Sequence, residues 1–135
     1  MRDYEYLQGL IDHENGNNGG ALEHLEKAIA LLPGEYGYWD GHADFFYSLA
    51  EVWADLEDWE RAREWYEKVP NLTKGRLYYL GTYVMTYFKL GNVFEALGKN
   101  AEAIVNYEKF LDLWKDADPG LPEVEDARKR LTKTK

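Results

Sequence analysis

Cysteine is absent from this chain of 135 residues, which excludes disulfide bonds and thiolate metal sites. The first residues, Met-Arg-Asp-Tyr-Glu-Tyr, lack the apolar segment of a signal peptide, and no later apolar run is long enough to span a membrane. Positive charge is scarce, because 16 basic residues stand against 25 acidic ones and the net charge is −9. Nucleic acids and anionic membranes both require a basic surface. These absences predict a cytoplasmic protein that binds neither nucleic acid nor membrane.

Hydrophobic residues make up 45% of the chain, and aromatic residues make up 16%. This content and this length suffice for one extended core in a single domain over 1–135. The charge is uneven, because five of the basic residues lie in the segment 128–135. Residues 1–127 therefore carry 11 basic and 25 acidic side chains, a net charge of −14. The body of the protein is strongly acidic.

Residues of the same kind recur at intervals of 41 along the chain. The recurring positions are a small residue (Gly9, Ala50, Gly91), an alanine (Ala21, Ala62, Ala103), a large residue (Leu25, Tyr66, Tyr107) and the pairs Glu26-Lys27, Glu67-Lys68 and Glu108-Lys109. Around each small residue and each alanine, the large apolar residues follow a helical spacing. The period predicts three helix-turn-helix units, and the small residues allow their helices to approach closely.

Turn-forming residues and prolines mark the boundaries of these units. Turns are expected at 16–19, 57–58 and 98–100, and Pro33 and Pro70 are expected to end the second helices of units one and two. Longer connections follow, and Pro119 marks a further break. The expected repeats cover about 2–33, 43–74 and 84–116. A last helix at about 121–133, with an acidic start and a basic end that suit the helix dipole, is expected to cap the stack.

The units resemble the tetratricopeptide repeat, in which a large residue, Leu-Gly, an aromatic residue, alanine, another aromatic residue and proline follow one another. The matches are Tyr87-x2-Leu90-Gly91-x2-Phe94 with Ala103-x3-Tyr107 in unit three, Phe46-x2-Leu49-Ala50-x2-Trp53 with Ala62-x3-Tyr66 in unit two, and Gly9, Ala21, Leu25 and Pro33 in unit one. In unit one, Asp12 stands where an aromatic residue is usual. The family's usual period is about 34 residues, so the extra residues are expected in longer helices or connections.

This resemblance implies an all-α, right-handed α-solenoid of three helix-turn-helix repeats with a C-terminal capping helix. The segment 107–115, together with the capping helix, is also similar to the repeat regions of certain bacterial serine/threonine kinases and transcriptional regulators. In tetratricopeptide proteins the first helix of each unit lines a concave groove. By this resemblance, the residues opposite the core stripes are expected to bind a partner: Asp44, Tyr47, Ser48, Glu51 and Asp55 in unit two, and Met85, Phe88, Lys89 and Asn92 in unit three.

Such a groove combines carboxylates with aromatic and thioether surface, which suits a protein or peptide with basic and apolar side chains. The alternative is that Tyr47 and Phe88 pack against the connections between repeats. A clamp for the C-terminal carboxylate of a chaperone tail is not expected, because Asp44 and Glu51 would repel the carboxylate.

No catalytic, metal or cofactor-binding constellation is recognisable. His13, His24 and His42 have no second histidine at i+3 or i+4, and His13 is interpreted as a solvated helix end. The glycine-rich segment 16–20 lacks the lysine and the preceding strand of a phosphate loop. Paired carboxylates are expected on any acidic helical surface, and nothing in the sequence places two of them in a dry pocket. We therefore expect no enzyme activity and no cofactor.

Two hypotheses follow. The first is a protein-interaction module, acting alone or as the regulatory part of a larger signalling protein, in which replacing Tyr47, Glu51 and Phe88 together abolishes binding. The second is a self-association or spacer element that forms a homodimer. In this hypothesis the basic end 128–135 docks into a neighbour's acidic groove. The alternative interpretations of this segment are a solvated helix end and a contact for nucleic acid. The second hypothesis predicts that the dimer weakens at high salt or without these residues.

Overall fold

The structure is a computed structural model that describes residues 2–32, 42–70, 80–114 and 122–134. Its helices are α1 (Arg2–Glu14), α2 (Asn18–Ala30), α3 (His42–Asp55), α4 (Trp59–Lys68), α6 (Leu80–Ala96), α7 (Asn100–Leu113) and α8 (Pro122–Thr134). These ranges contain helices and no strand, which confirms the predicted all-α class. None of the helices described is long and apolar enough to cross a membrane. Pro33, Pro119 and most of the longer connections lie outside the described residues.

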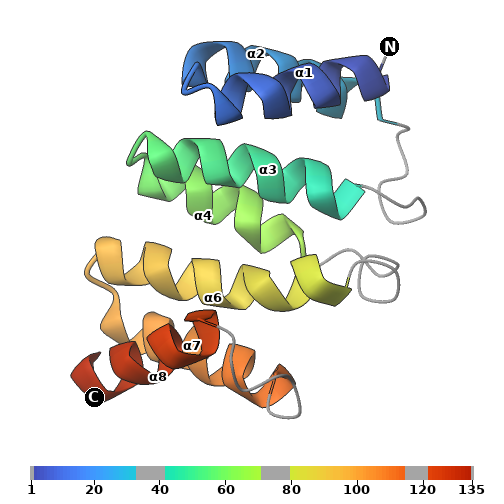
Figure 1. The fold of residues 1–135 in the computed structure, drawn as a ribbon. Coiled ribbons are helices and arrows are strands. Elements are labelled where there is room, and N and C mark those ends of the chain that lie inside the picture. The colour runs from blue at the N-terminus through green and yellow to red at the C-terminus, as the bar shows by residue number, and fades with distance from the viewer. Residues whose placement is uncertain (1, 33–41, 71–79, 115–121, 135) are drawn as a thin grey trace.

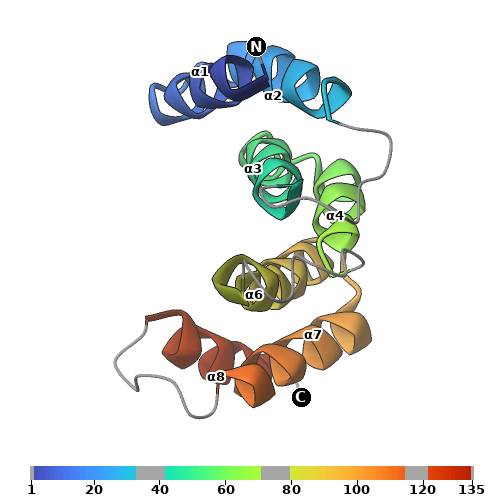
Figure 2. The ribbon, with the colours of Figure 1, turned by 90° about the vertical axis from the view of Figure 1, so that its right-hand side faces the viewer.

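The helices stack in pairs along the chain. α1 packs on α2, α3 on α4 and α6 on α7, and successive pairs meet through α2 with α3 and through α4 with α6 (Figure 1). The first helices α1, α3 and α6 form one layer, and the second helices α2, α4 and α7 form the other (Figure 2). This is the solenoid that the 41-residue period predicts.

The same turn closes each helix pair, at positions that are 41 residues apart. Gly16, Glu57 and Gly98 have positive φ angles of 79°, 59° and 76°. This left-handed region is open to glycine, whereas a side chain there meets its own backbone. The turn in the second repeat therefore carries local strain that the other two repeats avoid.

In the first two repeats, the side chain of the residue after the turn caps the second helix. The Asn17 and Asp58 side chains accept hydrogen bonds from the backbone N–H groups of Gly20 (3.1 Å) and Arg61 (3.2 Å). Lys99 occupies the equivalent position before α7 and makes no side-chain capping bond. The third repeat thus lacks one of the bonds that satisfy the free N–H groups at a helix start.

Small residues lie where the two helices of each repeat cross. A Cβ atom on Gly9 would come within 2.7 Å of Leu25 Cγ, and one on Gly91 would overlap the Tyr107 ring. Ala62 and Ala103 are completely buried, as the sequence predicts. Because the helices approach this closely, they bury the large side chains beside the crossings, which are Tyr66, Tyr107 and Phe110. Burial of each of these side chains contributes about 1.5–3 kcal/mol of transfer free energy.

The last helix packs on α7 and is tied to α6 by an ion pair. Val124 and Ala127 are buried against the core. The Arg130 guanidinium donates hydrogen bonds to Glu95 of α6 (2.6 Å) and to Asp126 of α8 (3.0 Å). This part of the basic C-terminal segment is therefore used within the chain.

Candidate functional site

The predicted binding residues lie on α3 and α6, in the layer of first helices (Figure 2). A cavity of about 300 Å³ opens between these two helices. It is lined by His13, Glu51, Ala54, Asp55, Trp59, Tyr66, Lys89, Asn92 and Val93. The fold thus brings four predicted residues, Glu51, Asp55, Lys89 and Asn92, into one site. We call this site the first-layer cavity.

An ion pair and a hydrogen bond join successive first helices at this cavity. Lys89 Nζ lies 3.6 Å from Glu51 Oε1, and each of these side chains is about one third exposed (32%). His13 Nε2 lies 2.5 Å from Asp55 Oδ2, and the Asp55 side chain remains 59% exposed. A partly exposed pair such as Glu51–Lys89 contributes only about 0–1 kcal/mol. A cation supplied by a partner can therefore compete with Lys89 for the carboxylates.

Asp44 and Ser48 also join neighbouring first helices. Asp44 accepts a hydrogen bond from Thr82 Oγ1 of α6 at 2.7 Å. The hydroxyl oxygens of Ser48 and Tyr6 of α1 lie 3.3 Å apart, and Ser48 is buried. These two predicted binding residues are positioned to hold the repeats together.

Tyr47 packs into the interior and holds Glu51. Its ring meets Tyr66 edge to face, with the ring centroids 5.5 Å apart. Burial raises the pKa of Tyr47 far above its ordinary value, and the negative charge of Glu51 together with a hydrogen bond to Glu51 adds to the increase. Tyr47 therefore stays neutral and orients the Glu51 carboxylate at the wall of the cavity.

The predicted exposure of Phe88 is wrong. Its side chain is only 6% exposed, and its ring centroid lies 5.3 Å from that of Phe110 and 6.0 Å from that of Tyr107. α6 contacts α3, α4 and α7, so less of its surface is free than a single apolar stripe suggests. Replacing Phe88 would remove core packing, so the triple substitution with Tyr47 and Glu51 is not a clean test of binding.

The remaining α6 positions are partly engaged. Met85 is half-buried against the core. Asn92 Oδ1 accepts a hydrogen bond from the Tyr107 hydroxyl at 2.7 Å. Asn92 therefore lines the cavity and also satisfies a buried hydroxyl, so its removal would affect stability as well as binding.

Five residues that line the first-layer cavity were not predicted to bind a partner: His13, Ala54, Trp59, Tyr66 and Val93. The contacts His13–Asp55 and Tyr6–Ser48 each join residues 42 apart, which is one more than the repeat period. That spacing is the signal that could have placed His13 opposite Asp55. Among the described residues, no three histidine, aspartate or glutamate side chains are grouped to hold a metal ion.

The fold and this face define a helical-repeat solenoid, and comparison with known proteins specifies its type. Residues 86–113 match the family model described as tetratricopeptide repeat. Among curated protein sequences, none matches the chain. The matched residues lie in α6 and α7, which form the third repeat.

Solved tetratricopeptide structures resemble nearly the whole chain. The Arabidopsis OM64 TPR domain has a TM-score of 0.75 at 20% identity, covering 98% of this chain and 94% of that chain. The first TPR of Spaghetti (RPAP3) bound to the HSP90 peptide SRMEEVD has a TM-score of 0.74 at 20% identity, covering 98% and 89%. The second TPR domain of human RPAP3, in complex with the HSP70 peptide SGPTIEEVD, has a TM-score of 0.70 at 20% identity, covering 99% and 98%. The chain thus has the fold of tetratricopeptide solenoids.

Proposed function

We propose that the first-layer cavity binds a segment of another protein with basic and apolar side chains. The observation that carries the proposal is the excess of carboxylate in the cavity, where Glu51 and the exposed Asp55 face a single lysine, Lys89, among the described residues. Trp59 and Tyr66 supply aromatic walls for an apolar side chain. Two of the structures with this fold hold peptides of other proteins, which supports binding rather than catalysis.

The proposed partner differs in charge from the peptides in those structures. SRMEEVD and SGPTIEEVD are acidic, whereas this face carries Asp44, Glu51 and Asp55. Carboxylates that meet carboxylates across an interface weaken binding, and opposite charges speed association. The chemistry of this face therefore favours a basic segment over an acidic tail.

We further propose that the module works in the cytoplasm, alone or as the regulatory part of a larger signalling protein. This proposal is motivated by the sequence of the segment 107–115, which resembles the repeat regions of bacterial kinases and regulators. The test is to isolate the native protein from the source cells and to determine whether this module is part of a kinase or regulator chain.

The test of binding removes the two carboxylates without changing side-chain shape. The variant carrying Glu51→Gln and Asp55→Asn should lose affinity for immobilised peptides that combine lysine or arginine with apolar residues. The control carries Glu60→Gln and Glu64→Gln on the exposed face of α4, and it changes the net charge by the same amount. It should bind like the wild type. Full affinity in the first variant, or preference of the wild type for SRMEEVD over basic peptides, would overturn the proposal.

A separate observation favours self-association as a second candidate function. Tyr4, Leu7 and Ile11 form a stripe on α1 and are 59%, 57% and 52% exposed. In the second repeat, Phe45 and Val52, which are 41 residues after Tyr4 and Ile11, are buried against the preceding helix pair. The α1 stripe is thus the open counterpart of a repeat interface, and the second candidate is a homodimer that pairs two such stripes.

Sedimentation over a range of concentrations tests the dimer. The wild type should associate, and Leu7→Lys should remain monomeric because the charge cannot be buried in the interface. Leu113→Lys, at an exposed leucine of α7, is the control and should associate like the wild type. A wild-type monomer at every concentration would exclude this candidate.

A further inference from the structure

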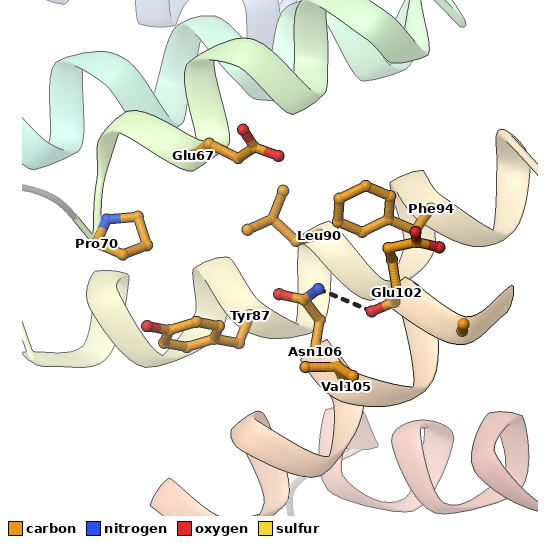
Figure 3. A pocket seen from close by; sticks show the side chains of 9 residues that line it. Glu67, Pro70, Tyr87, Leu90, Phe94, Glu102, Val105 and Asn106 are labelled. Carbon is orange, nitrogen blue, oxygen red and sulfur yellow. Dashed lines mark hydrogen bonds between the residues drawn. The ribbon is translucent and has the colours of Figure 1, made fainter. Parts of the chain in front are cut away.

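A larger cavity, of about 550 Å³, lies between α4, α6 and α7 (Figure 3). Tyr87, Leu90 and Phe94 of α6 form its apolar wall. Glu67 of α4 and Glu102 of α7 face it from two sides (Figure 3). The cavity shares no lining residue with the first-layer cavity, and we call it the α4–α7 cavity.

In the second repeat, the chain fills the equivalent space with its own side chains. Trp65 lies with its ring centroid 5.6 Å from that of Phe46. The Arg61 guanidinium stacks over the Trp53 ring, 4.6 Å from its centroid. An indole and a cation therefore cover the apolar wall that Phe46 and Trp53 form.

In the third repeat, both of these side chains are replaced, and Lys109 Nζ lies 5.5 Å from the centroid of the Tyr87 ring. Asn106 stands 41 residues after Trp65, and Glu102 stands 41 residues after Arg61. The Asn106 Nδ2 donates a hydrogen bond to the backbone oxygen of Glu102 at 2.8 Å, so this short side chain folds back along its own helix (Figure 3). The cavity is open because an amide has replaced the indole and a carboxylate has replaced the cation beside Phe94.

We propose that the α4–α7 cavity binds a tryptophan side chain flanked by arginine or lysine, carried on a segment of another protein. The tryptophan supplies the indole that Trp65 supplies in the second repeat, and the flanking cation replaces Arg61. The cavity volume falls within the range of about 300–1,000 Å³ that is typical of ligand sites. Glu102 matches the positive charge of the ligand, and Glu67, whose Oε1 lies 3.9 Å from Arg63 Nε, adds a second carboxylate at the cavity. This site goes beyond the proposed function of the first-layer cavity and is independent of it.

The probe is the acetylated and amidated peptide Gly-Arg-Trp-Arg-Gly, titrated into the protein and followed by nuclear magnetic resonance chemical shifts. Saturable shifts are expected at Tyr87, Phe94 and Val105, the last of which is exposed beside the cavity. The peptide with glutamate in place of arginine should bind about tenfold more weakly or less, because two favourable ion pairs become repulsive. The peptide with alanine in place of tryptophan should not bind.

Three protein variants decide whether binding occurs in this cavity. Asn106→Trp should fill the cavity as Trp65 does, should not lower the unfolding midpoint, and should abolish binding. Leu113→Trp adds an indole to the same helix outside the cavity and should bind like the wild type. Glu102→Arg should bind the wild-type probe more weakly and should lose most of the preference for arginine over glutamate.

Several results would overturn the proposal. One is that Asn106→Trp binds the probe as the wild type does. Another is that the wild type binds the arginine and glutamate peptides equally well. A third is that binding is lost in the variant with Glu51→Gln and Asp55→Asn rather than in Asn106→Trp. Self-association of the wild type that disappears in Asn106→Trp would show that a second copy fills the cavity. Failure of the first-layer cavity to bind any basic peptide would leave this site unaffected, because the two sets of variants do not overlap.

Discussion

Replacing Glu57 by glycine should stabilise the protein by about 0.5–1 kcal/mol. Glu57 has a φ of 59°, and a side chain in this region costs about 1–2 kcal/mol through its contact with the backbone. Glycine removes that cost but loses more backbone entropy on folding, by about 0.5–1 kcal/mol. The turn geometry accepts glycine, because Gly16 and Gly98 occupy the equivalent positions with similar angles. The difference between the two terms gives the expected gain.

Thermal and urea unfolding followed by circular dichroism measure this gain. For a chain of this length, it corresponds to a rise of roughly 2–4 °C in the unfolding midpoint. Glu57→Gln controls for the lost negative charge, because it keeps the strained side chain, and it should gain less. Gly98→Ala should lose stability, because it introduces a Cβ atom at a φ of 76°. If Glu57→Gly were no more stable than Glu57→Gln, the strain argument would be refuted.

Three further predictions concern stability. Lys99→Asp should add the helix cap that the third repeat lacks and raise the free energy of unfolding by about 1 kcal/mol, and an unchanged urea midpoint would contradict it. Ala103→Leu should overpack a completely buried helix crossing and cost about 1–3 kcal/mol in urea unfolding, and no loss would mean that the repeat register is wrong. Burial raises the pKa values of Tyr47, Tyr66 and Tyr107 above the unfolded value of about 10. Their contribution to stability is therefore complete below about pH 10 and is lost as the pH rises further. Tyrosinate absorbance should show a group of tyrosines that ionise only on unfolding, and normal titration of every tyrosine in the folded protein would disprove this.

The repeat and its turns could be predicted from the sequence because they depend on positions that tolerate few residue types. A helix crossing as close as that at Ala62 or Gly91 admits only a small side chain, so the requirement leaves a visible period. The turns at Gly16 and Gly98 leave a similar mark, since glycine is favoured at positive φ. Asp12 departs from this period, because it stands where the other repeats carry an aromatic residue. Its carboxylate instead accepts a hydrogen bond from the Gln8 side chain at 3.3 Å.

The outward face of α6 could not be predicted in the same way. Assigning one stripe to the core assumes that a helix has a single buried side. α6 has neighbours on several sides, and it buries Phe88 opposite the predicted stripe while Tyr87, within that stripe, lines a cavity. Which residues of α3 and α6 meet depends on the relative rotation of successive repeats. A sequence period alone does not give that rotation.

The position shared by His24, Trp65 and Asn106 shows where the repeats of this chain differ in chemistry. In the first repeat, His24 Nδ1 lies 2.6 Å from the Glu5 carboxylate, so a polar contact occupies the position. In the second, Trp65 packs on Phe46 and closes the space with apolar surface. In the third, Asn106 turns back onto α7 and leaves the space open. The turn that precedes the helix with this position is similar in all three repeats, with a positive φ at equivalent residues. We therefore expect differences in binding between the repeats to depend on such substituted positions, and in the third repeat Leu90 and Phe94 line a cavity that Glu67 and Glu102 also line.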